Sequence, residues 1–183
     1  MKNVKFLSVV LFVSLLFTAC SDDDTPEPVN EEEVITTLTV TLTPNGGGTP
    51  ITLQTRDLDG DGPNVPVVTV SGDLATGVTY NGVIVLLNET ETPAEDITQE
   101  VEGEDEEHQF FYTVGSGLDV TTAYTNFDGN GNPLGTEFTL TVGAVSSGAL
   151  TFTLRHEPTK PNTGLSDAGG ETDIEATFNL TIQ

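Results

Sequence analysis

Apolar and polar residues alternate one by one along most of the chain after position 33. In the run VITTLTVTLT, the side chains of Val34, Leu38, Val40 and Leu42 fall on one face, and threonines fall on the other. This alternation, with many β-branched residues, is typical of a β-strand that is buried on one side. The folded part of the chain is therefore expected to begin with a half-buried strand.

Eight similar runs follow, and turn-forming segments separate them. The runs cover residues 51–55, 66–71, 78–88, 109–114, 118–126, 137–142, 149–155 and 174–182. The separating segments include PNGGG, DGDGPN, FDGNGNPLG, VSSGA and DAGG, whose glycine, asparagine, aspartate and proline favour turns. No stretch of helical length repeats apolar residues at three- and four-residue spacing. The pattern predicts an all-β domain.

The segment LATGVTY points to a particular kind of β-domain. It spaces Leu74, Gly77 and Tyr80 as in the tyrosine corner of Greek-key sandwiches, in which a tyrosine hydroxyl returns to the backbone a few residues upstream. With nine short strands, this predicts an immunoglobulin-like or fibronectin-like two-sheet β-sandwich with Greek-key connections. A jelly roll is the alternative, because that architecture also uses many short strands.

The first nineteen residues have the features of a secretory signal. Lys2 and Lys5 precede an apolar run at 6–17, which is short for a membrane span. Ala19 stands directly before Cys20, as in a bacterial lipobox, whose cysteine becomes the lipidated first residue of the mature protein. We therefore expect residues 1–19 to be a lipoprotein signal peptide and Cys20 to carry a lipid anchor in the outer membrane. An ordinary signal peptide with an incidental cysteine is the alternative.

Residues 20–33 are acidic and nearly without apolar side chains, so they are expected to form a disordered tether before a single domain at 34–183. An acidic run after the lipidated cysteine resembles the surface-export signal of Bacteroidota lipoproteins. The expected location is the cell surface, and a periplasm-facing lipoprotein is the alternative. Because the chain has no other cysteine, the domain must be stable through its core alone.

The chain is strongly acidic, with five Lys+Arg, 29 Asp+Glu and a net charge of −24. Loss of the signal peptide would leave three basic residues against 29 acidic ones, a net charge of −26. Nucleic acid and anionic membrane surfaces are poor candidates as partners, because phosphate contacts need clustered lysine and arginine. A cation is a natural partner for such a surface, although solubility alone would also explain the acidity.

One acidic segment matches the opening of a calcium loop. Asp57, Asp59 and Asp61 are spaced two apart, and Asn64 could add an oxygen ligand. Calcium takes about six to eight oxygen ligands. The closing acid expected at the twelfth position is Val68 instead. A polar turn between strands is therefore favoured over a calcium site.

The two histidines predict a different cation site. His108 begins one strand and His156 ends another, and each shares the inward face of its strand. If the intervening strands alternate in direction, three reversals bring both histidines to one end of the sandwich. The acids expected near them are Glu107, Glu157, Glu171 and Asp173.

Imidazole nitrogens with one or two carboxylates suit zinc, and also iron or copper. No such ion should be required for folding, because the strands supply an apolar core. The alternative is that both histidines lie at the edge of the core, hydrogen-bonded to the backbone. The prediction of a shared metal site depends on the two histidines meeting.

The sequence offers little support for an enzyme. It has no GxSxG motif and no phosphate loop with lysine, and its one cysteine is assigned to the lipid. The absence of tryptophan disfavours a glycan-binding accessory domain, which would stack sugars on aromatic rings. A structural or adhesive surface module is the remaining alternative to a ligand-binding protein.

The segments NEEEVITTLTVTL, LDGDGPNVP, EHQFFYT, LRHEPTKP and GGETDIEATFNLTI resemble small flavobacterial lipoproteins. These proteins are labelled "type 1 periplasmic binding fold superfamily protein" and tend to be encoded beside a TonB-dependent outer-membrane receptor. The label implies a two-lobed α/β protein, which disagrees with the run of strands in this chain. The resemblance implies a surface location and an accessory role in nutrient uptake through such a receptor. It supplies no ligand and no binding residues.

Overall fold

The computed structural model describes residues 33–60 and 62–183. The expected signal peptide, Cys20 and the expected tether up to residue 32 lie outside the described residues, as does Asp61. In the described ranges, no helix is both long and apolar enough to cross a membrane.

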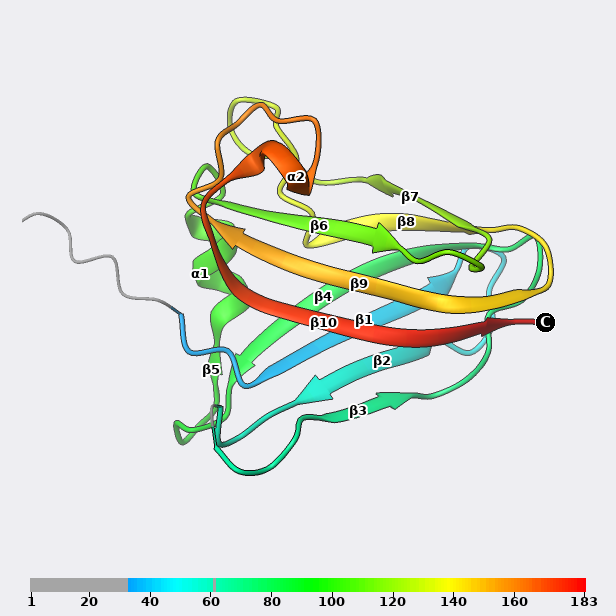
Figure 1. Cartoon of the computed structure of the whole chain (residues 1–183), viewed down its shortest axis with the longest axis horizontal. Coiled ribbons are helices and arrows are strands. Elements are labelled where there is room, and N and C mark those ends of the chain that lie inside the picture. Colours follow the sequence, from blue (N-terminus) through cyan, green and yellow to red (C-terminus); the bar gives the residue numbers. More distant parts are fainter. Residues whose placement is uncertain (1–32, 61) are drawn as a thin grey trace, which may run out of the picture. The chain divides into compact units, whose positions relative to one another are not determined.

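The described chain forms ten strands and two short helices (Figure 1). The strands are β1 (Thr37–Pro44), β2 (Ile51–Arg56), β3 (Val67–Val70), β4 (Thr79–Asn88), β5 (Glu95–Asp96), β6 (His108–Val114), β7 (Val120–Tyr124), β8 (Glu137–Val142), β9 (Ser146–His156) and β10 (Glu171–Ile182). The helices are α1 (Ile97–Gly103) and α2 (Leu165–Ala168). Each of the nine alternating runs contains a strand, so the strands predicted from the alternation are confirmed.

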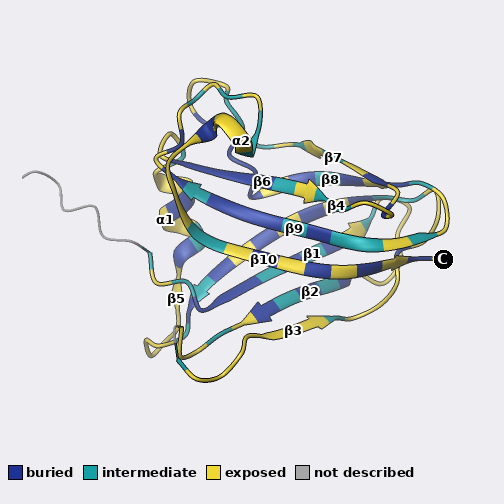
Figure 2. Cartoon of the chain, in the orientation of Figure 1, coloured by how far each residue is buried: buried dark blue, intermediate teal, exposed yellow. Residues whose placement is uncertain are grey.

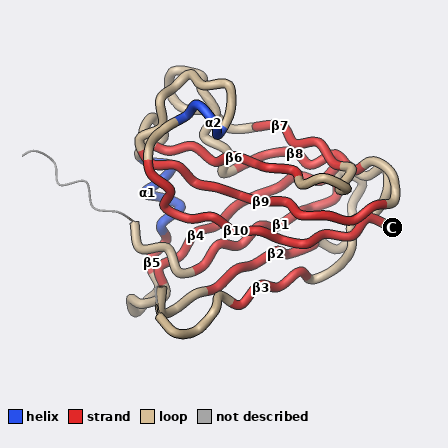
Figure 3. Tube along the Cα trace, viewed as in Figure 1, coloured by secondary structure: helices blue, strands red, loops and turns tan. Residues whose placement is uncertain are grey.

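Two antiparallel sheets pack face to face, and the predicted all-β sandwich is confirmed (Figures 1 and 3). The larger sheet has the order β3-β2-β1-β4-β8-β7, with the two-residue β5 paired to β4. The smaller sheet has the order β10-β9-β6. Within the larger sheet, β4-β1-β2-β3 is a Greek key, in which three consecutive strands are followed by a fourth that returns beside the first.

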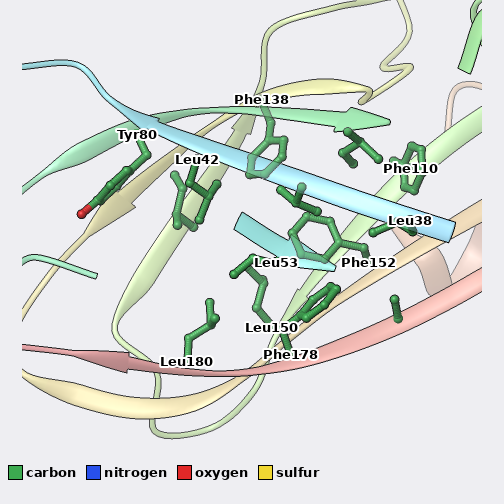
Figure 4. Close-up of a cluster of buried hydrophobic side chains, with 14 of the residues drawn as sticks. Leu38, Leu42, Leu53, Tyr80, Phe110, Phe138, Leu150, Phe152, Phe178 and Leu180 are labelled. Carbon is green, nitrogen blue, oxygen red and sulfur yellow. The ribbon is translucent and has the colours of Figure 1, made fainter. Parts of the chain in front are cut away.

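The core lies between the sheets, where apolar side chains of alternate strand positions meet (Figures 2 and 4). Phe152 of β9 is fully buried, and its ring packs edge-on against Tyr112 and Phe178, with centroids 5.7 and 5.9 Å away. Phe138 of β8 lies across Gly82 of β4, where a Cβ atom would come within 2.3 Å of the ring. The aromatic cluster thus needs a glycine in the neighbouring strand.

The tyrosine corner is confirmed. The backbone N–H of Ala75 donates to the Tyr80 hydroxyl oxygen at 3.0 Å, and Tyr80 is buried at the start of β4. This hydrogen bond ties the connection that follows β3 to the strand that the connection enters. It fixes the corner of the sandwich at which β4 begins.

The two helices were not predicted. Helix α1 is only seven residues long and buries two side chains, Ile97 and Val101, which are four positions apart. Asp96 caps its N-terminus by accepting a hydrogen bond from the N–H of Thr98. So short a helix shows no repeated apolar period, which is why the sequence pattern did not reveal it. The four-residue α2 is shorter still.

Candidate metal centre

Strand pairing brings the two histidines together. β6 and β9 are antiparallel neighbours, and His108, at the start of β6, is the register partner of His156, at the end of β9. β10 begins on the other side of β9, with Glu171 as the register partner of His156. Figure 1 shows β6 starting, β9 ending and β10 starting at the same end of the sandwich. The structure therefore places both histidines at one end of the domain, as the alternation of strand directions predicted.

The two imidazole rings stack, with centroids 4.6 Å apart and an angle of 27° between their planes. His108 is completely buried, and His156 is 3% exposed. Two buried imidazoles in contact need partners for their polar nitrogens, since burying an unpaired polar group is costly. One nitrogen of each ring lies beside a carboxylate.

Glu33 lies against both rings. Its Oε1 is 2.7 Å from Nε2 of His108, and its Oε2 is 3.5 Å from Nδ1 of His156. The Glu33 side chain is 3% exposed, so it belongs to the domain and not to a solvated tether. The predicted boundary after residue 33 was therefore wrong for this residue. Nothing in the run of three glutamates distinguishes Glu33 from its neighbours, because its contacts are with residues more than seventy positions away.

Asp173 completes the buried group. The register of β10 against β9 shifts between Thr172 and Ile174, and this irregularity contains Asp173. Its Oδ1 lies 3.9 Å from Nδ1 of His156, and its side chain is 2% exposed. One ligand atom from each of Glu33, His108, His156 and Asp173 lies within 4.8 Å of the others. We call these four residues the inner group.

The carbonyl oxygen of Glu104 orients His108. It lies 3.2 Å from Nδ1 of His108 at the C-terminal end of α1. A carbonyl can only accept, so Nδ1 carries a proton and Nε2 is the nitrogen directed at Glu33. Metal-binding histidines commonly have this arrangement, in which one ring nitrogen donates to a carbonyl and the other binds the ion.

Negative charge is concentrated around the inner group. The pKa of the Glu100 carboxyl on α1 is raised, first by burial and then by the charges of Glu33, Glu104 and Glu95. Nearby negative charges raise the pKa of a carboxyl, so this part of the shift indicates an excess of negative charge around Glu100. A cation bound at the inner group would offset this excess.

Two buried atoms of the inner group have no hydrogen-bond partner among the described residues. They are Oε2 of Glu33 and Nε2 of His156. Buried polar atoms are almost always hydrogen-bonded, and an exception requires an explanation. A bound cation would supply a partner for the Glu33 oxygen.

A second acidic group adjoins the inner one. Glu107 and Glu157 are exposed, and their carboxylates lie within 4.8 Å of a ring nitrogen of His156. We call Glu107, Glu157 and His156 the outer group. Glu171 pairs with His156 in the sheet, but its side chain is exposed and belongs to neither group. Six residues were predicted for one site. Five of them lie in the inner or the outer group, and Glu171 lies in neither.

The segment at Asp57 and Asp59, for which the sequence favours a polar turn over a calcium site, is a hydrogen-bonded turn where the structure describes it. Asp59 accepts from the backbone and side-chain nitrogens of Asn64 at 3.3 and 2.7 Å, and Asp57 accepts from the N–H of Asp59. These bonds lower the pKa of Asp59, the largest contribution coming from the Asn64 side chain. The third aspartate, Asp61, lies outside the described residues. The turn lines a hollow of about 430 Å³ together with residues of β2 and the first residue of β3.

A buried ion pair between Lys160 and Asp128 contacts the backbone of His108. Lys160 donates to the carbonyls of Asp105 and His108, each at 2.6 Å, and lies 3.2 Å from Oδ2 of Asp128. Asp128 also accepts from both nitrogens of Asn132. The segment FDGNGNPLG is therefore more than an exposed turn, because its aspartate holds the ammonium that contacts the backbone of His108.

Comparisons of the chain with protein-family profiles, with curated proteins and with solved structures find no match. The functional inference therefore depends on the sequence and on the geometry of the site.

Proposed function

We propose that the domain captures a divalent transition-metal ion through Glu33, His108, His156 and Asp173. The observation that carries this proposal is the gathering of four buried ligand atoms within 4.8 Å of one another, contributed by four separate segments. Buried carboxylates are costly without a positive partner. In so acidic a chain, a metal ion is the natural one.

The spacing of the ligand atoms suits a small tetrahedral ion. Ligands at about 2.0–2.1 Å from zinc are about 3.3 Å from one another in tetrahedral geometry. The distances from Glu33 to the two imidazoles are 2.7 and 3.5 Å, and the distance from Asp173 to His156 is 3.9 Å. Changes of up to about 0.6 Å in these three distances would bring them to the tetrahedral separation. Zinc is the first candidate, and iron or copper could use the same donors.

The ligand set favours binding over catalysis. A catalytic zinc usually keeps one position open for water or substrate, whereas four protein ligands close the coordination sphere. We therefore propose a non-enzymatic binding protein. The lipobox-like sequence at Cys20 and the high negative charge support a lipid-anchored protein that gathers cations at the cell envelope. Delivery to a TonB-dependent receptor extends this proposal and derives from the sequence resemblance alone.

Isothermal titration of the metal-free protein with zinc chloride tests the proposal. We expect one tight, saturable equivalent. His108→Ala and His156→Ala should each abolish most of the binding, and Glu33→Gln and Asp173→Asn should weaken it while preserving side-chain shape. Glu175→Gln, which changes an exposed acid on β10, is the matched control and should bind like the parent.

Circular dichroism of each variant verifies that the β-sandwich is intact. If both histidine variants fold and bind zinc as tightly as the parent, the inner group does not hold the metal. The exposed acids would then account for the affinity.

A further inference from the structure

The inner group is closed to solvent. The side chains of its four members are between 0 and 4% exposed. A hydrated ion cannot reach them directly, because it must first lose its water and pass the surrounding side chains. A site of this kind needs an entrance where an ion can bind part-dehydrated.

The outer group lies next to the inner one and is open to solvent. Glu107 directly precedes His108, and Glu157 directly follows His156, so both acids extend from the ends of the strands that carry the histidines. The N–H of Glu157 donates to the carbonyl of Glu107 at 2.7 Å, which holds the two strand ends together. Both carboxylates are exposed, and they approach a ring nitrogen of the buried His156.

The backbone holds Glu157 in a conformation that few residues adopt. Its φ is 47°, in the left-handed region, where non-glycine residues are uncommon. Gly170 packs against the same peptide, and a Cβ atom there would lie 2.1 Å from the carbonyl oxygen of His156. The turn after β9 is therefore confined on the side of β10, and its acidic side chain remains beside Glu107.

His156 can serve both groups because imidazole has two nitrogens. Nδ1 lies 3.5 Å from Glu33 and 3.9 Å from Asp173, on the inner side. Nε2 is buried and has no hydrogen-bond partner among the described residues. A buried nitrogen without a partner, on a side chain 3% exposed, indicates a missing ligand. One nitrogen of His156 lies within 4.8 Å of the Glu107 and Glu157 carboxylates, and we assign it to Nε2 because Nδ1 faces Glu33 and Asp173.

We propose that Glu107, Glu157 and Nε2 of His156 form an outer cation site, through which a divalent transition metal enters the inner group. The inference rests on the proposed function of the inner group and assigns its route of loading. The ion first binds the two exposed carboxylates and Nε2, while Nδ1 carries the ring proton. On transfer, the bond to Nε2 breaks and a bond to Nδ1 forms. The Nδ1 proton leaves to water, and Nε2 takes a proton from water.

Cobalt(II) binding to the metal-free protein tests this route, because visible absorption of the ion reports its coordination by imidazole. The test variant is Glu107→Gln/Glu157→Gln. The control is Asp73→Asn/Glu137→Gln, which removes the same charge from two exposed acids on other parts of the surface. Stopped-flow mixing at low ionic strength gives the association rate, and equilibrium titration gives the number of sites.

We expect the parent and the control to bind one tight equivalent at equilibrium, because Nε2 of His156 is protonated once the ion is bound at Nδ1. The test variant should retain the tight equivalent and associate about 10-fold more slowly, because the focusing carboxylates are gone. Equal association rates in the test variant and the control would overturn the entrance. A parent that binds no cobalt would instead refute the inner site, so the two failures are distinguishable.

Discussion

His108 and His156 face each other across the β6–β9 ladder, with their ring centroids 4.6 Å apart and Glu33 in contact with both. These residues are distant in sequence but meet because β6 and β9, which carry them, are neighbours in the smaller sheet. The chain between them forms β7 and β8 of the other sheet. The pair therefore depends on the pairing of β6 with β9.

The first prediction concerns metal and stability. Zinc at about 100 times its dissociation constant should stabilise the domain by about 2.7 kcal/mol, because it binds only the folded chain. For a domain of this size, the Tm should rise by about 5–11 °C. Thermal melts followed by circular dichroism, with zinc and with chelator, measure this rise. Chelator alone should leave the β-type spectrum intact, since the core is apolar. Loss of that spectrum would reveal a structural ion instead.

The second prediction concerns Glu100. Its raised pKa means that folding favours the protonated carboxyl. The corresponding stability is fully present below the ordinary glutamate pKa of about 4.3 and is lost as the pH rises through the folded-state pKa. Glu100→Gln should therefore raise the Tm of the metal-free protein slightly at pH 7 and leave it unchanged at pH 3. Bound zinc should reduce the gain.

Glu175→Gln is the control for this measurement, because Glu175 is an exposed glutamate on β10. A Tm for Glu100→Gln below that of the parent at pH 7 would contradict the concentration of negative charge around the inner group.

The third prediction concerns Lys160. Its ammonium is buried between Asp128 and two carbonyls, and Lys160→Met would leave the aspartate without its charge partner. Breaking a buried ion pair costs about 3 kcal/mol or more. We expect the Tm to fall by about 6–12 °C. The double variant Lys160→Met/Asp128→Asn should recover part of this loss in the same melt. No recovery would mean that the carbonyl contacts, and not the ion pair, dominate.

The fourth prediction gives the pH dependence of the same pair. Burial would raise the pKa of Asp128, but hydrogen bonds from Asn132 and Lys160 outweigh it, and the pKa is lowered. This carboxylate therefore stabilises the fold above the ordinary aspartate pKa of about 3.9, and its contribution is lost as the pH falls through the lower folded-state value. Asp128→Asn should be less stable than the parent at pH 7. The difference should narrow below about pH 4 in urea titrations at each pH.

The fifth prediction concerns the tyrosine corner. Tyr80→Phe keeps the ring and leaves the N–H of Ala75 without its acceptor, at a cost of about 1–2 kcal/mol. The expected fall in Tm is about 2–8 °C. Tyr124→Phe is a matched control, because it removes a hydroxyl that donates to the carbonyl of Phe110 from a less buried position. An equal or larger fall in the control would indicate that the corner has no special importance.

The period of the sequence predicts the strands well, because alternation follows directly from the pleat of a strand with one buried face. It does not predict how strands are shared between sheets, since the inward faces of both sheets look alike. Helix α1 was missed because only Ile97 and Val101 carry its buried face. The meeting of His108, His156 and Asp173 at one end of the sandwich was predicted by counting the reversals of strand direction between them. Glu33 was not predicted to join them, since no local pattern encodes a contact made across the fold.

The position of Glu33 has a mechanical consequence. Everything from residue 1 to residue 32 precedes it in the chain, and β1 begins only at Thr37. Tension applied along the chain from that side would arrive at a ligand of the inner group before it arrived at any strand. An ion held by Glu33 and by the ends of β6, β9 and β10 would then spread the pull over three strands, instead of leaving it to β1, which lies between β2 and β4.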